Sequence, residues 1–365
     1  MINRFMLGLV ASILLLASGC KDPGTGSTSG AALYTYDNST SAVFVWSDLS
    51  ALYSGTATTV APTKQITSSL FTSKITSLAW GGLCLDSQNG YLYLVSDTGN
   101  IVRVANFRSQ SGVANSLDVV SFSLSQTGRL SGSTFGQASV DAQTNTLYVT
   151  ENSSSGTQIW VVSNASSQFQ DATIALQALQ MSGDSGGTGV ASGSGSVYAF
   201  LLNGSDVGSL VTFSGPRLRK GTSAGFAPAS TLIGSSTLIG EYGSLALDTG
   251  NGYLFVARHN SDSGGGSAAP IQAFTTGMFG QGYNQAPVLT LGSGTVQSNL
   301  RVIAHAGTKN WLVGLAGDGT STTTSTSYGS IWIWQTPLGG SGAVTITASP
   351  TTSLFKGLAV DGNAS

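Results

Sequence analysis

Charged side chains are scarce in this sequence of 365 residues: 14 are basic and 16 acidic, and there are only two histidines and two cysteines. So few basic residues, with a formal net charge of −2, provide no patch for nucleic acid. The two histidines lie far apart and no cysteine pair accompanies them, so no zinc site of known spacing is present. GxSxG, Walker A and strand-linked GxGxxG motifs are also missing. What remains is 41% hydrophobic residues and 49 glycines, which is enough apolar material for a large core.

The first twenty residues have the pattern of an export signal. An apolar stretch follows Arg4 and ends in small residues before Cys20, and no later apolar run is long enough to span a bilayer. The segment ASGC that ends at Cys20 resembles the lipobox of bacterial lipoproteins, and Lys21 resembles the pattern of those sent to the outer membrane. The resemblance implies a signal peptide over 1–19 and an acylated Cys20 that anchors the chain in the membrane. An ordinary secretion signal with an incidental cysteine is the alternative.

The body of the chain repeats. Residues 82–107 contain three short apolar runs separated by turn clusters of Asp, Asn, Ser and Gly, which is the pattern of antiparallel strands joined by tight turns. A fourth extended run follows each such triplet, and successive runs lie about 55 residues apart. These runs begin at Ala61, Asn115, Thr173, Ala227, Ala286 and Ala343. Repeats of this length with four strands each predict the blades of a β-propeller.

The last unit is split between the two ends of the chain. Residues 355–365 supply only a first strand, and residues 32–46 supply a second and a third strand with no first strand before them. Joining them closes a ring and covers the sheet edges that an open array would expose. The sequence therefore predicts an all-β fold: a six-bladed β-propeller with four antiparallel strands per blade. We expect a flexible tether over 20–30 and a single domain over 31–365.

The blade pattern resembles that of NHL-repeat propellers, which are common among exported bacterial proteins. The best matches are Leu245–Val256 and Leu358–Asp361, whereas the Asp of the pattern is missing around Gly189–Gly193 and Ile303–Gly307. The resemblance implies the fold. The family contains binding modules, scaffolds and a few enzymes, so the repeat does not name a function.

Three sets of side chains are candidates for special roles. One set closes the first strands, where each carboxylate is expected to bond the following turn: Asp86, Asp141, Asp248 and Asp361. A second set places one acid near each connection between second and third strands, as a rim that attracts Ca²⁺ or a cationic ligand or simply forms turns: Asp37, Asp97, Glu151, Asp206, Asp262 and Asp318. The third set is expected around the channel mouth, as a polar ligand site or as solvated loop residues: Trp80, Glu241, Tyr242, Arg258, His259, Arg301 and Lys356. His305 is expected to bond a turn, and Cys84 to be a small buried hydrophobe.

These features lead to a prediction of a monomeric, lipid-anchored protein of the bacterial envelope. We expect its propeller to act without catalysis, as a binding or scaffolding module for a protein or glycan partner. The alternative is a metal-dependent hydrolase or lyase of the lactonase type, whose catalytic residues the sequence does not identify. The inner strands offer mainly Gly, Ala, Ser, Leu and Val, which counts against that alternative. No cofactor other than Ca²⁺ is expected. A purely structural envelope component is a third possibility, suggested by Ser/Thr/Gly-rich loops such as 317–329.

Overall fold

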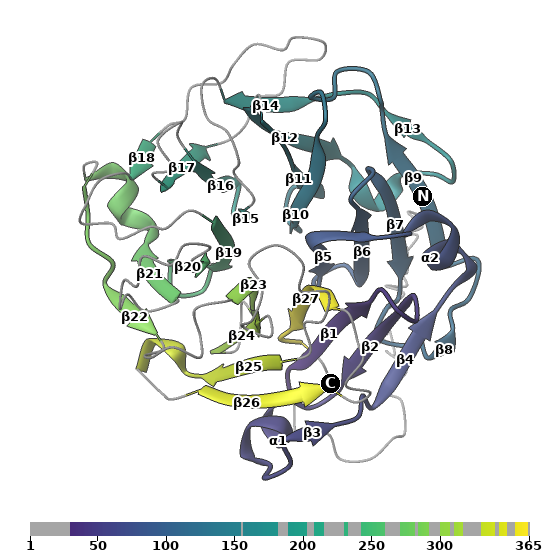
Figure 1. Cartoon of the computed structure of the whole chain (residues 1–365), viewed down its shortest axis with the longest axis horizontal. Coiled ribbons are helices and arrows are strands. Elements are labelled where there is room, and N and C mark those ends of the chain that lie inside the picture. Colours follow the sequence, from purple (N-terminus) through teal and green to yellow (C-terminus); the bar gives the residue numbers. More distant parts are fainter. Residues whose placement is uncertain are drawn as a thin grey trace, which may run out of the picture.

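Six small antiparallel sheets are arranged in a ring around a central axis (Figure 1). The structure is a computed structural model, and it describes residues 30–154, 156–181, 189–202, 208–214, 230–232, 242–259, 271–281, 284–291, 300–306, 310–316, 330–339, 343–348 and 355–363. The predicted six-bladed β-propeller is confirmed, with four strands in every blade. Cys20 and the other residues of the predicted signal and tether, up to 29, lie outside the described residues, as do the predicted acids Asp206, Asp262 and Asp318.

Each blade is built outward from the axis. The innermost strands are β5 (Leu78–Asp86), β10 (Thr134–Asp141), β15 (Val190–Gly193), β19 (Tyr242–Asp248), β23 (Leu300–His305) and β27 (Phe355–Asp361). The second strands are β6 (Tyr91–Ser96), β11 (Thr146–Ser153), β16 (Ser196–Leu202), β20 (Tyr253–His259), β24 (Trp311–Ala316) and β1 (Ala32–Asp37). The third strands are β7 (Asn100–Ala105), β12 (Gly156–Ser163), β17 (Gly208–Ser214), β21 (Ile271–Thr275), β25 (Ser330–Gln335) and β2 (Ala42–Trp46). The fourth are β9 (Val119–Leu124), β14 (Ala178–Met181), β18 (Ser230–Leu232), β22 (Leu289–Leu291), β26 (Ala343–Ala348) and β4 (Lys64–Thr67).

The closing blade joins the two ends of the chain, as predicted. β27 pairs with β1 in antiparallel register, so that Ala32 lies opposite Asp361 and Tyr34 opposite Ala359. The first strand predicted within residues 355–365 is thus confirmed, and it covers Phe355–Asp361.

Two short strands and two short α-helices were not predicted, and a third short strand falls within the predicted run from Thr173, which the structure divides between β13 and β14. β3 (Thr59–Val60), β8 (Gly112–Val113) and β13 (Thr173–Ile174) each lie in the connection between a third and a fourth strand. Each crosses to the preceding blade and adds a fifth, parallel strand to its outer edge, on β26, β4 and β9 respectively. The helices are α1 (Leu49–Ser54), capped by the side chain of Asp48, and α2 (Ser69–Lys74), capped by Ser68.

The core is divided into six layers, and each layer fills the space between two neighbouring blades. In the layer beside the closing blade, Phe44, Trp46 and Phe355 pack edge to face. The innermost strands converge so closely that some positions admit only glycine. A Cβ added at Gly357 would lie 2.5 Å from Leu78 Cδ2, and one added at Gly189 would lie 2.5 Å from the carbonyl oxygen of Gly243. Within the described residues no helix is both long and apolar enough to cross a membrane.

Candidate functional site at the channel mouth

Four innermost strands carry a β-bulge where they begin, at one mouth of the central channel. In β27 the register shifts around Lys356, because Gly357 pairs with Tyr36 whereas Phe355 pairs with Asp37. In β23 the shift falls at Arg301, and in β5 it covers the residues from Ala79 to Gly82, which include Trp80. β10 shifts at Gly136 and Gln137. A bulge redirects the side chain of its extra residue, so the strands present these side chains differently from a regular ladder.

Three of the bulged residues gather at the mouth; we call Trp80, Arg301 and Lys356 the mouth cluster. Arg301 Cζ lies 5.4 Å from the centroid of the Trp80 ring, and Lys356 Nζ lies 5.5 Å from it. Both distances are typical of cation–π contacts. All three side chains are half-buried. The structure thus brings these three of the expected residues together.

Hydrogen bonds fix the mouth cluster to the neighbouring turns. Lys356 Nζ donates to Ser77 Oγ at 2.7 Å, and the backbone N–H of Asp97 donates to the Ser77 carbonyl at 3.0 Å. Burial lowers the pKa of Lys356, and the nearby Asp97 carboxylate acts in the opposite direction. Asp97 is thus the predicted rim acid that the structure places beside the cluster.

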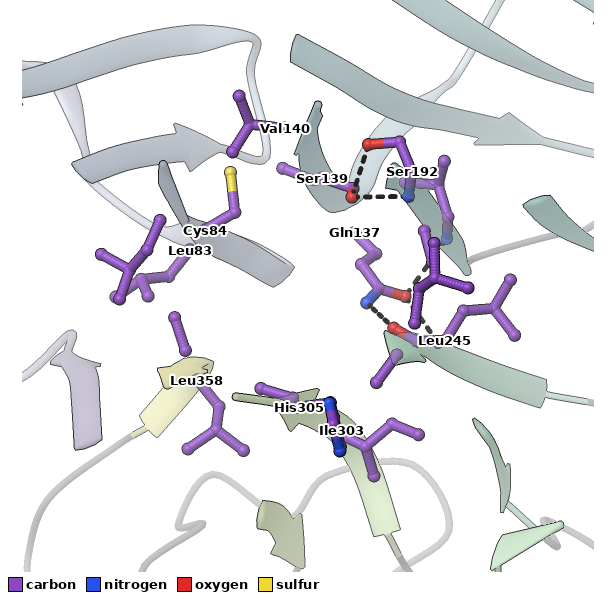
Figure 2. Close-up of a pocket in the computed structure, with 18 of the residues that line it drawn as sticks. Leu83, Cys84, Gln137, Ser139, Val140, Ser192, Leu245, Ile303, His305 and Leu358 are labelled. Atoms are coloured by element: carbon purple, nitrogen blue, oxygen red, sulfur yellow. Dashed lines mark hydrogen bonds between the residues drawn. The ribbon is translucent and has the colours of Figure 1, made fainter. Parts of the chain in front are cut away.

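Below the mouth, the channel contains a cavity of about 150 Å³. The innermost strands of all six blades line it. In every blade one small side chain of the innermost strand faces this cavity. It stands two residues before the strand-closing Asp or the residue that takes its place: Cys84, Ser139, Ala191, Ala246, Ala304 and Ala359. Figure 2 shows Leu83 and Leu358 on one side of this opening and Gln137 and Leu245 on the other. Among the described residues that line it, none is Asp, Glu, Lys or Arg.

At the end of the cavity nearest the mouth, the Gln137 side chain links three blades by hydrogen bonds. Its Nε2 donates to the Leu245 carbonyl at 2.7 Å, and its Oε1 accepts from the backbone N–H groups of Leu245 at 2.9 Å and Val190 at 3.2 Å. Ser139 and Ser192 are joined nearby at 2.9 Å between their hydroxyl oxygens (Figure 2). The sequence analysis did not single out Gln137, because its partners lie on other blades.

His305 lies at the lower part of the same lining. Its side chain is 1% exposed, its ring stacks on Phe255, and its Nε2 lies 3.7 Å from Asp248 Oδ2. Burial lowers the pKa of His305 to about 4, and the Asp248 carboxylate opposes that shift only in part. The imidazole is therefore neutral at pH 7. In this blade Ala306 takes the place of the strand-closing Asp, and its N–H donates to the Trp311 carbonyl at 3.0 Å. His305 therefore lies one residue before that position.

We predict that His305 makes the propeller less stable in mild acid. The unfolded imidazole binds a proton near pH 6.5 but the folded one only near pH 4, so protons favour the unfolded chain as pH falls through that window. The free energy of unfolding should fall by about 2 kcal/mol between pH 7 and pH 5 because of this residue. Urea titrations at both pH values measure it. In His305→Gln the drop should be smaller by that amount, and an unchanged drop would contradict the assignment.

The carboxylates that close the first strands bond the turns that follow them, as predicted. Asp86 accepts from the backbone N–H of Asn89 at 2.9 Å, and Asp248 accepts from that of Asn251 at 3.0 Å. Asp141 also reaches the next blade, where it accepts from the N–H of Gly195 at 3.0 Å. Asp361 forms a two-pronged ion pair with Arg108, with Nε–Oδ2 at 2.5 Å and Nη2–Oδ1 at 2.8 Å.

Two of the predicted rim acids form hydrogen bonds that hold the structure around them. Asp37 is the last residue of β1, and it accepts hydrogen bonds from the hydroxyls of Ser39 and Thr40, each at 2.7 Å. Glu151 lies within β11 and is fully buried, because the β11–β12 hairpin extends beyond it. Its oxygens accept from Arg129 Nε at 3.2 Å and from Trp160 Nε1 at 2.5 Å, as well as from Ser133 and Gln158.

Three of the remaining candidates lie on the blade next to that of Arg301. Tyr242 pairs with His259, and Gly243 with Arg258, at the mouth end of β19 and β20. The structure describes the backbone of these residues, and Glu241 lies outside the described residues. Over the described part of the chain, no three His, Cys, Asp or Glu side chains come together as a metal site would require. Cys84 is buried, and burial raises the pKa of its thiol.

Comparisons with known proteins agree with the fold and show no family. No family model and no curated protein matches the chain. Among solved structures, a chain of the nidogen/laminin complex is similar, with a TM-score of 0.55 and 12% identity over 91% of this chain and 98% of that one. Hydrazine synthase of Kuenenia stuttgartiensis gives a TM-score of 0.44 at 11% identity, over 77% of this chain and 69% of that one. Dihydro-heme d1 dehydrogenase NirN gives 0.41 at 14% identity, over 91% and 57%. At such identities the likeness shows the fold alone: this chain is a six-bladed β-propeller with a basic and aromatic cluster at one mouth of its channel.

Proposed function

We propose that this propeller is a non-enzymatic binding or scaffolding module, and that it recognises a protein or glycan partner through the face around the mouth cluster. The observation that carries this proposal is the gathering of Trp80, Arg301 and Lys356, each displaced by a bulge, on one face of the ring. Tryptophan and arginine are the side chains most often responsible for binding energy at interfaces. The similar chain of the nidogen/laminin complex comes from an assembly of two proteins, which makes a protein the first class of partner to seek.

Attachment to the outer membrane through an acylated Cys20 is part of the same proposal. It rests on the lipobox-like segment before Cys20 and on Lys21 after it. Two or three acyl chains anchor a protein stably, because each buried CH₂ contributes about 0.8 kcal/mol. The tether would then hold the chain at the membrane, and the propeller would bind the partner. The lactonase-type alternative, with Ca²⁺ held by rim acids, gains no support from the positions of Asp37 and Asp97.

Photo-crosslinking in cells tests the proposal. A photoreactive residue is placed at Thr98, an exposed position in the β6–β7 turn beside Asp97, or at Gln88, an equally exposed position in the β5–β6 turn at the opposite end of the blade. A specific adduct should form from Thr98 and not from Gln88. Equal or absent adducts at both positions would reject the mouth face as the binding surface. In the same cells Cys20→Ala should abolish palmitate labelling and release the chain from the membrane fraction.

A further inference from the structure

The chain enters the propeller on the side opposite the mouth cluster. β1 runs antiparallel to β27, so its first residue, Ala32, pairs with Asp361 at the end of β27, whereas Lys356 of the mouth cluster lies at the beginning of that strand. The backbone N–H of Leu49, just after β2, donates to the Ala31 carbonyl at 2.8 Å. The N-terminal segment therefore joins the fold where the first strands and the third strands end.

We call this side the turn face, because it carries the turns between first and second strands and the beginnings of the connections that follow third strands. In four more blades a residue just after the third strand donates its N–H to a carbonyl of such a turn: Phe107 to Gly90, Ala165 to Asn145, Thr276 to Gly252 and Thr336 to Asn310. The turns over 87–90, 142–145 and 249–252 contain no charged residue. Contact of these turns with a less polar environment therefore requires no charge to be desolvated.

Exposed apolar side chains accompany the turn face. Among the described residues, the large apolar side chains that are exposed all lie in connections between third and fourth strands: Val113, Leu117, Phe169 and Val288. Leu117 is 88% exposed and Phe169 72%. Isolated exposed apolar side chains are common on proteins, so the position that these residues share is the informative feature.

Leu117 and Phe169 belong to the same edge of the ring. Leu117 stands two residues before β9, and the segment after Phe169 runs along that strand, since the N–H of Asp171 donates to the Ser121 carbonyl at 2.7 Å. This blade is the neighbour of the closing blade, because β8 of its connection pairs with β4. The two most exposed large apolar side chains thus lie beside the blade through which the chain enters.

The proposed anchor lies within reach of this edge. Cys20 precedes Gly30, the first described residue, by ten positions, and ten residues span at most about 35 Å when fully extended. An acylated Cys20 would therefore keep the turn face close to the bilayer. Docking would then be intramolecular, so that even a weak attraction between the propeller and the lipid would be effective.

We propose that the turn face docks on the surface of the lipid bilayer, with Leu117 and Phe169 inserted among the headgroups. Apolar side chains at the boundary between headgroups and acyl chains add to the binding that a covalent lipid provides. The mouth cluster, at the other end of the first strands, then faces away from the membrane and toward the partner. This inference rests on the proposed function, because it uses the acylated Cys20.

The reaction of introduced cysteines with a water-soluble maleimide tests this orientation. The acylated full-length protein is inserted into preformed vesicles of phosphatidylethanolamine and phosphatidylglycerol, and the Cys20→Ala chain is measured in solution. Cys84 is buried and acylation blocks the thiol of Cys20, so the introduced cysteine reports alone. Leu117→Cys should react about tenfold more slowly on vesicles than in solution, which corresponds to about 1.4 kcal/mol of net docking. Thr98→Cys, exposed on the mouth side, should react equally fast in both.

Two substitutions in the Leu117→Cys chain make the result specific. Phe169→Ser removes the second inserted side chain, so the rate on vesicles should return toward the rate in solution. Val288→Ser is the matched control: Val288 is 47% exposed but precedes β22, which lies across the ring from β9 (Figure 1), and the rate should stay low. Equal rates for Leu117→Cys on vesicles and in solution would overturn the inference, as would an equal slowing of Thr98→Cys.

Palmitate labelling and the Thr98 photo-adduct separate this inference from the proposed function. If the wild type takes up no palmitate, the anchor is rejected and the docked orientation with it, while the Thr98 adduct still decides whether the mouth face binds a partner. If the chain is labelled but Leu117→Cys reacts as fast on vesicles as in solution, only the docking is rejected.

Discussion

A chain that ends at residue 354 should not form a stable propeller. Such a chain lacks β27, the innermost strand of the closing blade, whose side chains are almost entirely buried: Phe355 is 0%, Leu358 2% and Val360 6% exposed. Burial of three such side chains contributes about 6 kcal/mol, comparable to the whole stability of a typical domain. The truncation also strips β1 of its partner and removes Asp361, the carboxylate that pairs with Arg108.

Far-UV circular dichroism, urea titration and gel filtration measure this effect. We expect loss of the cooperative unfolding transition and an expanded or aggregated chain. A chain that ends at Asn363 keeps all of β27 and should unfold like the full-length protein. A synthetic peptide of residues 355–365 should restore the transition when added to the truncated chain. A truncated chain that unfolds cooperatively at the normal urea concentration would show that the ring does not depend on β27.

Glu151→Ala should destabilise the protein by about 4 kcal/mol, which is the range for removal of one partner of a buried ion pair. The carboxylate is fully buried, and donors surround it: Arg129, the backbone N–H of Leu130, Ser133, Gln158 and Trp160. Without it, a cation with a 16% exposed side chain and several buried N–H groups lose their acceptor. Glu151→Gln keeps the volume and one oxygen acceptor, although its NH₂ group faces other donors. It should therefore destabilise the protein somewhat less than Glu151→Ala.

Asp171→Asn is the matched control for Glu151. Asp171 also lies in an ion pair, with Lys74, but its side chain is 68% exposed. Exposed pairs contribute less than about 1 kcal/mol, so this variant should differ little from the wild type. Urea denaturation of all three variants at pH 7 gives the comparison. A Glu151→Ala protein as stable as Asp171→Asn would show that the buried network does not hold the blade.

The strands were predictable because each is a short apolar run bounded by turn residues, and because the pattern recurs. The run Tyr91–Val95 and the turn after Asp86 show this well, since the observed β6 covers Tyr91–Ser96. The strands β3 and β8 left no such signal, and β13, although it lies in the predicted run from Thr173, gave no sign that it would pair with β9 of the preceding blade. Each is two residues long, too short for any periodicity, and each exists only because the preceding blade offers an open edge.

The candidate site was predictable only in part. Trp80, Arg301 and Lys356 stand near the beginnings of first strands, and all first strands of a propeller begin on the same face, so their convergence follows from the repeat. The bulges that displace them depend on the register of the partner strand, which the sequence does not encode locally. Glu151 seemed to belong to a turn because the length of its hairpin was not evident. The pairing of Arg108 with Asp361 joins residues 253 positions apart, and no local pattern reports it.

The pairing of β1 with β27 has a mechanical consequence. Because the strands are antiparallel, the start of β1 at Ala32 lies directly opposite the end of β27 at Asp361. A pull applied between the two ends of the domain therefore acts on one end of this pair, and its hydrogen bonds break one after another. A pull along the strands in opposite directions would instead load all of these bonds together. The β1–β27 pair should therefore resist tension between the two termini less than shear along its strands. No such tension arises while only one terminus is attached.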